Sequence, residues 1–155
     1  MIHSQDNKCQ TVSWAVGDAP LELGPCIAAI GNFDGVHRGH GKVIEAAIDS
    51  ARKAGVAASA VTFDPHPREF FRHDDVPFCL ADRIEKERLL VAAGVGRVIH
   101  VPFDDNLRCT DAAAFVTDIL PAIGVTGLFA GFDSVSYTHL RAHETGRNVV
   151  CRLLD

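Results

Sequence analysis

Hydrophobic residues along the chain follow two alternating patterns. Short runs that are apolar at nearly every position predict buried strands, and longer stretches with apolar residues three or four apart predict helices. The predicted strands are residues 26–30, 56–63, 97–101 and 126–130. The predicted helices are residues 39–55, 80–93 and 110–123. Because the strands are apolar throughout, this order predicts an α/β fold, with a parallel sheet covered by helices on both faces.

The loops that follow the predicted strands are where a binding site is expected. In a parallel sheet of this kind, ligands bind beyond the carboxyl ends of the strands. Three of the four loops carry the most polar clusters of the chain.

Composition narrows the class of protein further. The 155-residue chain is 47% hydrophobic and 23% charged, as in folded globular domains. Its 15 basic and 20 acidic residues give a net charge of −5, which offers no general positive field for nucleic acid. No stretch reaches the apolar length of a membrane span. The five cysteines form no CxxC pair, and Cys26 lies in an apolar run, so we expect a reducing, cytoplasmic setting.

Residues 31–40, which follow the first predicted strand, read GNFDGVHRGH. The three glycines permit tight turns and a close approach of the backbone to a ligand. The helix that follows presents free N–H groups and a partial positive charge. His37 and His40 can share one face of its first turn and donate hydrogen bonds to phosphate oxygens. From the residues alone, a solvated glycine-rich turn and a zinc site formed by Asp34, His37 and His40 remain alternatives.

Residues 63–67, which follow the second predicted strand, read FDPHP. The two prolines restrict the backbone, so the loop is expected to be stiff. A stiff loop that carries an aromatic ring, a carboxylate and an imidazole suits a planar, polar ligand. A proline-rich turn with an exposed histidine is the alternative.

Together the two segments resemble the signatures of bacterial FAD synthetases, the FMN adenylyltransferase module of bifunctional riboflavin kinase/FAD synthetase. Residues 37–40 carry the HxGH element of a wider nucleotidyltransferase superfamily, within the longer family form GxFDGVHxGH. VTFDPHP, at residues 61–67, is similar to the second family signature. The resemblance implies a Rossmann-like nucleotidyltransferase that joins FMN and ATP to give FAD and diphosphate.

The resemblance also implies roles for individual residues. His37 and His40 are expected to be catalytic, stabilising the charge that develops as diphosphate leaves, with Mg²⁺ bridging the phosphate oxygens. The residues expected to bind ATP and its phosphates are Gly31, Asn32, Phe33, Asp34, Gly35, His37, Gly39 and His40. The residues expected to bind the flavin are Phe63, Asp64, Pro65, His66 and Pro67.

Other polar residues near these loops are expected to face solvent. Arg68, Arg72 and His73 could contact the FMN phosphate, but a solvated loop is favoured for them. The same interpretation is given to three residues near the end of the third strand, His100, Asp104 and Asp105.

The similarity ends after the fourth predicted strand. Gly131 and Asp133 match the start of a third family segment, which implies a place for Asp133 near nucleotide and magnesium. We expect residues 1–133 to form the N-terminal part of the adenylyltransferase domain, with the riboflavin kinase domain absent. Residues 134–155 show no convincing strand or helix and are expected to be a non-family tail, for which an artefactual origin is one interpretation. A sheet without its last strands would expose an apolar edge.

Two other functions remain open. One is a fragment that binds nucleotide or flavin without turnover. The other is a different HxGH nucleotidyltransferase, such as a cytidylyltransferase, although those enzymes typically have threonine in place of Asn32 and lack the 63–67 loop. The expected partners are the small molecules ATP and FMN, with no nucleic acid and no membrane, and the sequence leaves the oligomeric state undetermined.

Overall fold

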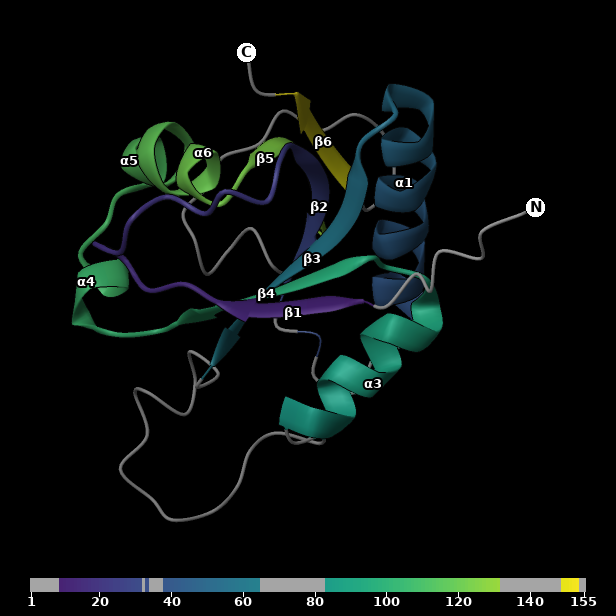
Figure 1. Ribbon diagram of the computed structural model, residues 1–155, viewed down its shortest axis with the longest axis horizontal. Helices are drawn as coiled ribbons and strands as arrows, with labels where there is room; N and C mark the ends of the chain where they lie inside the picture. Colours follow the sequence, from purple (N-terminus) through teal and green to yellow (C-terminus); the bar gives the residue numbers. More distant parts are fainter. Residues whose placement is uncertain (1–8, 32, 34–37, 65–82, 132–148, 154–155) are drawn as a thin grey trace.

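A single six-stranded sheet organises the chain (Figure 1). The computed structural model describes residues 9–31, 33, 38–64, 83–131 and 149–153. The strands are β1 (Gln10–Ser13), β2 (Cys26–Ile30), β3 (Ala57–Asp64), β4 (Arg97–Pro102), β5 (Val125–Gly131) and β6 (Val149–Leu153). The helices are α1 (Arg38–Ala54), α3 (Arg83–Ala93), α4 (Asp105–Arg108), α5 (Ala112–Ala114), η1 (Phe115–Ile119) and α6 (Leu120–Ala122).

The strand order is β1-β4-β3-β2-β5-β6. Strands β1 to β5 pair in parallel, and β6 pairs antiparallel with β5. From β2 the chain first builds outward through β3 and β4, and then returns to place β5 on the other side of β2. The order therefore reverses beside β2, and a reversal of this kind is where such sheets hold ligands.

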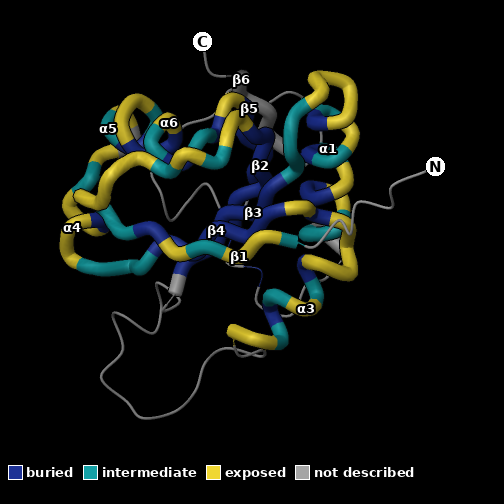
Figure 2. Tube along the Cα trace, viewed as in Figure 1, coloured by how far each residue is buried: buried dark blue, intermediate teal, exposed yellow. Residues whose placement is uncertain are grey.

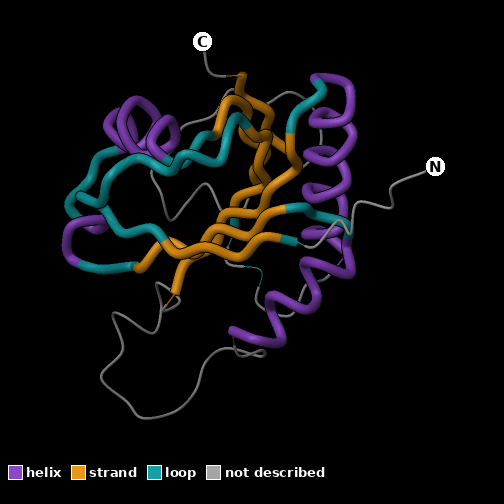
Figure 3. Tube along the Cα trace, in the orientation of Figure 1, coloured by secondary structure: helices purple, strands orange, loops and turns teal. Residues whose placement is uncertain are grey.

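Helices cover both faces of the sheet, as the apolar strands predict (Figure 3). Side chains alternate between the faces along a strand, so β2 sends Ile27 and Ala29 into one core and Ala28 and Ile30 into the other. Helices α1 and α3 contribute to the first core, and the segment from η1 to α6 contributes to the second. Every residue of β2 is buried, and Figure 2 shows the central strands as the most buried part of the chain. The predicted α/β fold is confirmed.

Helices α5, η1 and α6 follow one another without a break, where the sequence predicts one helix over 110–123. Pro121 has no N–H to donate to the preceding turn. The helix widens just before it, and the N–H of Leu120 donates to the carbonyl of Phe115, five residues earlier. A wide turn of this kind keeps Phe115, Ile119 and Leu120 buried despite the proline.

Two strands lie where the sequence predicts none. β1 is an edge strand with mostly exposed residues, so its sequence carries little apolar signal. The expectation that residues 134–155 add no strand is wrong, because β6 pairs with β5 from Gly127 opposite Leu153 to Gly131 opposite Val149. The expected bare edge beside β5 is therefore occupied by β6. Backbone pairing along β5 holds this strand in the sheet.

Helix α3 does not bury all of the apolar residues that predict it. Ile84, one of the apolar positions that predict this helix, is 76% exposed. The buried residues of α3 are Lys86 and Leu90. The strand positions opposite the start of α3 are polar, so a polar face of the helix packs there.

We expect Gly124→Ala to destabilise the fold far more than Gly55→Ala. Both glycines have positive φ, +80° and +69°, which costs an alanine about 1–2 kcal/mol. A Cβ at Gly55 meets nothing within 4 Å, whereas one at Gly124 lies 2.7 Å from the carbonyl oxygen of Gly24. That oxygen accepts a 3.2 Å hydrogen bond from Arg97 Nη1, so it cannot easily move.

The free energies of unfolding should therefore fall by about 1–2 kcal/mol for Gly55→Ala and by about 3 kcal/mol or more for Gly124→Ala. Urea denaturation of both variants measures the difference. Equal losses would show that the turn at Gly24 yields freely.

Candidate functional site

The first predicted segment joins the end of β2 to the start of α1. The N–H of Gly31 donates to the carbonyl of Val61 at 3.1 Å, which carries the β2–β3 pairing one residue past β2. Helix α1 begins at Arg38, so Gly39 and His40 lie in its first turn. The remaining predicted residues of this segment lie outside the described residues: Asn32, Asp34, Gly35 and His37.

Phe33 links this segment to the core. Its side chain is 1% exposed and packs in the core beneath α1. Its φ of +50° is unusual for a residue with a side chain, and the burial of the ring offsets the strain. The ring meets the half-buried ring of His40 edge-on, with centroids 5.3 Å apart and planes at 72°. Phe33 therefore restricts the orientation of His40, and any contact of Phe33 with a ligand would have to come from its backbone.

The start of α1 is suited to an anion. The helix has 17 residues, with no acidic residue in its first turn and with Arg52 and Lys53 in its last. The free N–H groups and the helix dipole make the first turn partially positive. His40 adds a ring nitrogen to the same turn, so the described residues here can hold phosphate oxygens.

The second predicted segment begins inside the core. The Phe63 ring is 5% exposed and meets the Phe103 ring edge-on at 6.3 Å. Asp64 is the last residue of β3 and lies opposite Pro102 of β4. Phe63 thus anchors the loop from the core side. The rest of the segment, and the basic residues after it, lie outside the described residues: Pro65, His66, Pro67, Arg68, Arg72 and His73.

Strands β2 and β3 place the starts of the two segments at the same edge of the sheet. They are parallel neighbours, with Ile30 opposite Val61. The chain leaves both strands at their carboxyl ends, at the same edge of the sheet. The residues expected to form a site therefore follow strands that end at the same edge of the sheet.

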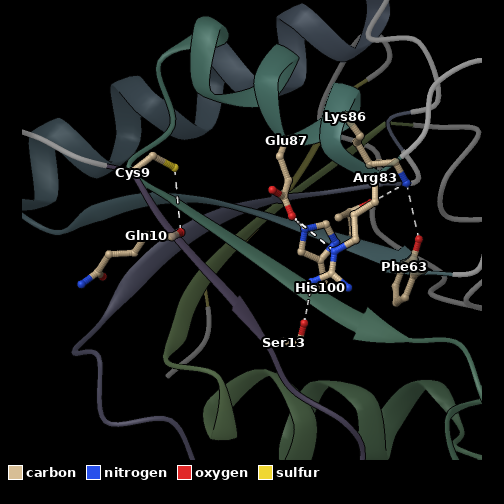
Figure 4. Close-up of polar contacts among 9 residues, drawn as sticks. Cys9, Gln10, Ser13, Phe63, Arg83, Lys86, Glu87 and His100 are labelled. Atoms are coloured by element: carbon tan, nitrogen blue, oxygen red, sulfur yellow. Dashed lines mark hydrogen bonds and ion pairs between the residues drawn. The ribbon is translucent and has the colours of Figure 1, made fainter.

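A row of polar side chains crosses the sheet just before this edge. Thr62 lies opposite His100, and His100 lies opposite Ser13, on neighbouring strands. The start of α3 supplies a partner to each (Figure 4). Lys86 Nζ donates to Thr62 Oγ1 at 3.3 Å, His100 Nε2 contacts Glu87 Oε1 at 2.7 Å, and Arg83 Nη2 donates to Ser13 Oγ at 2.8 Å.

His100 is not in a solvated loop, so that expectation is wrong. It belongs to β4 and is 1% exposed. The predicted strand 97–101 already contained it, and a histidine inside an apolar strand was the available signal. Burial lowers the pKa of His100, as do the charges of Arg83 and Lys86, while Glu87 opposes the shift. The neutral ring donates from Nε2 to the Glu87 carboxylate, and its buried Nδ1 has no hydrogen-bond partner among the described residues.

The sequence-based interpretation missed Lys86, Glu87 and Arg83. Charged residues in a helix usually lie in solvent, yet Lys86 is only 5% exposed. Burial raises the pKa of the Cys9 thiol, and the negative charge of Glu87 raises it further.

The remaining residues expected near the site are Asp104, Asp105 and Asp133. Asp104 caps α4, because its carboxylate accepts the N–H of Leu107 at 2.9 Å, and Asp105 is exposed. Asp133 lies outside the described residues. In the described ranges, no three His, Cys, Asp or Glu side chains gather to hold a metal. None of the helices there combines the length and apolar character needed to cross a bilayer.

A family model for FAD synthetase matches residues 20–145. The chain belongs to the FAD synthetase family. It is 41% identical over 109 residues to a bifunctional riboflavin kinase/FMN adenylyltransferase of Pseudomonas fluorescens, covering 70% of this chain and 35% of that protein. The corresponding protein of Escherichia coli K12 is 38% identical over 105 residues, covering 68% of this chain and 33% of that protein.

A FAD synthetase of Listeria monocytogenes is 33% identical over 106 residues, covering 68% of this chain and 43% of that protein. The chain thus spans about a third of the bifunctional relatives' length. A solved structure, described as a macrolide-efflux protein from Streptococcus pneumoniae, superposes with a TM-score of 0.67 at 23% identity. The superposition covers 77% of this chain and 41% of the Streptococcus pneumoniae chain, and this similarity supports the fold alone.

Burial of His100 predicts a pH-dependent stability that His100→Gln removes. The folded pKa lies below the ordinary value of about 6.5, so the unfolded chain binds the proton more readily. The free energy of unfolding should therefore fall as pH drops below about 6.5, and the loss should continue until pH passes the lowered folded pKa. The loss attributable to His100 is at most about 1.4 kcal/mol per pH unit.

Denaturation of both proteins between pH 7.5 and pH 4.5 tests this window. Subtracting the two curves isolates His100 from the other histidines. Curves that stay parallel below about pH 6.5 would mean that His100 titrates normally in the folded protein.

Proposed function

We propose that the chain acts as an FMN adenylyltransferase, converting FMN and ATP to FAD and diphosphate. The observation that carries the proposal is the parallel pairing of β2 with β3, which brings Gly31, the first residue of GNFDGVHRGH, and the start of FDPHP to one edge of the sheet. Membership of the FAD synthetase family supports the same assignment. Because the match covers only about a third of these relatives' length, activity of this chain on its own is part of the proposal.

The reaction needs no nucleophile from the protein. An oxygen of the FMN phosphate attacks the α-phosphorus of ATP, a new P–O bond forms, and the bond to the β-phosphate oxygen breaks. The attacking oxygen is already ionised, so no general base is required. Catalysis then consists of positioning the reactants and stabilising negative charge on the departing diphosphate.

The residues at the start of α1 are proposed to bind the triphosphate. They combine the glycine-rich turn from Gly31 to Gly39 with the partially positive helix start. His37 and His40 are the proposed catalytic residues, and Phe33 supports His40 from the core. Asn32, Asp34 and Gly35 complete the proposed ATP-binding set, with Asp34 ordering the loop.

Magnesium is proposed to enter with its nucleotide as MgATP. The described part of the phosphate site has no carboxylate in the first turn of α1, and a helix start disfavours a cation alone. Mg²⁺ commonly keeps several waters and binds through phosphate oxygens, so it needs few protein ligands. Asp133, which follows β5, is the proposed protein group nearest to it.

The flavin is proposed to bind at the end of β3. Asp64, Pro65, His66 and Pro67 are the proposed contacts, and the buried Phe63 holds the loop from below. A cytoplasmic setting is part of the proposal, and it is supported by the described cysteines Cys9, Cys26 and Cys109, which are free thiols.

We expect the purified chain to form FAD from FMN and MgATP, and His40→Ala to reduce turnover at least tenfold to hundredfold. Loss of a hydrogen bond that stabilises the transition state has effects on the order of a hundredfold. Chromatographic separation of FAD from FMN measures the rate. Arg52→Ala, in the exposed last turn of the same helix, is the matched control.

An unchanged turnover number in His40→Ala would remove His40 from the mechanism. Binding of FMN and ATP without any FAD would instead identify the chain as a nucleotide- and flavin-binding fragment, the alternative that its short span leaves open.

A further inference from the structure

Lys86 is a buried cation with contacts at the end of β3. It lies in the first half of α3 and is 5% exposed. Its Nζ donates to Thr62 Oγ1 at 3.3 Å and to the carbonyl oxygen of Phe63 at 3.5 Å. Figure 4 shows the side chain reaching from α3 to this carbonyl. Burying a lysine is costly unless its N–H donors find acceptors. The burial of Lys86 is therefore stabilised by the two acceptors at the end of β3.

The carbonyl of Phe63 occupies a particular place in the sheet. Carbonyl groups along a strand point alternately to its two neighbours. Val61 accepts a hydrogen bond from Gly31, so its carbonyl points toward β2, and the next carbonyl on that side is Phe63. The described pairing with β2 ends at Ile30 opposite Val61. Lys86 thus reaches β3 two residues beyond the end of that pairing.

We propose that Lys86 is a positioning residue for flavin binding: its ammonium, held on Thr62 and the Phe63 carbonyl, fixes the peptide between Phe63 and Asp64, at the start of the proposed flavin-binding loop. The inference rests on the proposed function, in which this loop contacts FMN. Asp64 follows directly after the bonded carbonyl, so a rotation of that peptide would reorient Asp64, a proposed flavin contact.

The effect is expected to be selective for one substrate. The described contacts of Lys86 are with β3, whereas the proposed triphosphate site is built from the end of β2 and the start of α1. His40 is oriented by Phe33, which belongs to that same segment. Loss of Lys86 should therefore weaken FMN binding and leave ATP binding nearly unchanged.

The test compares four proteins: the wild type, Lys86→Met, the double variant Lys86→Met/Thr62→Val, and Lys53→Met. Methionine keeps the length of the side chain and removes the donor. Lys86→Met alone leaves the Thr62 hydroxyl facing an apolar side chain. The double variant removes that hydroxyl as well, so the two side chains match again. The Phe63 carbonyl still lacks its hydrogen bond from Lys86. Lys53 is an exposed lysine in the last turn of α1 and is the matched control.

FMN binding is measured by fluorescence polarisation and MgATP binding by calorimetry, both well below each variant's unfolding midpoint. The dissociation constant for FMN should rise about tenfold or more in Lys86→Met, the scale of one hydrogen bond to a charged group. That for ATP should change less than about twofold. The double variant should regain thermal stability while its FMN affinity stays low, and Lys53→Met should match the wild type.

Three results would overturn the proposal. FMN affinity could be unchanged in Lys86→Met, it could recover together with stability in the double variant, or FMN and ATP affinities could fall in parallel. The second and third results would reduce Lys86 to a packing residue. Absence of FMN binding by the wild type would refute the proposed function itself, and the positioning role with it.

Discussion

Parallel pairing between β2 and β3 is the constraint on which the proposed site depends. Parallel strands must be joined by a crossover, here through α1, and a crossover requires the sheet to be covered on its faces. The same pairing sends the chain out of both strands at one edge, with Ile30 opposite Val61. Gly31 and Asp64, in the two segments, therefore lie at the same edge of the sheet although α1 separates them in the sequence.

The surroundings of this edge are more polar than the rest of the core. Thr62, His100 and Ser13 form a row across three strands, and α3 meets the row with charged side chains. The helix consequently exposes Ile84 and buries Lys86. A packing surface built from hydrogen bonds is directional, since each bond requires one donor at one acceptor. An apolar surface at this position would hold α3 with less control over its rotation.

Two types of support therefore hold the segments at the site. The segment after β2 is held by the buried Phe33 ring and its edge-on contact with His40. The segment after β3 is held by the Phe63 ring on one face of the sheet and by Lys86 on the other. Apolar anchors set the depth of each segment, and the polar contacts set its orientation.

Periodicity in the sequence was sufficient for the strands at the centre of the sheet and the helices on its faces, because burial on both sides imposes an unbroken apolar run such as Cys26–Ile30. The motifs GNFDGVHRGH and FDPHP could also be identified from the sequence, since they depend on residue type and short spacing. Tertiary structure alone decided the strands at the two edges of the sheet, because β1 is mostly exposed and both β1 and β6 are defined by backbone pairing with a neighbour. It also decided the burial of Lys86 and the pairing of His100 with Glu87, because these partners lie on different elements and a local sequence pattern does not indicate contacts between distant parts of the chain.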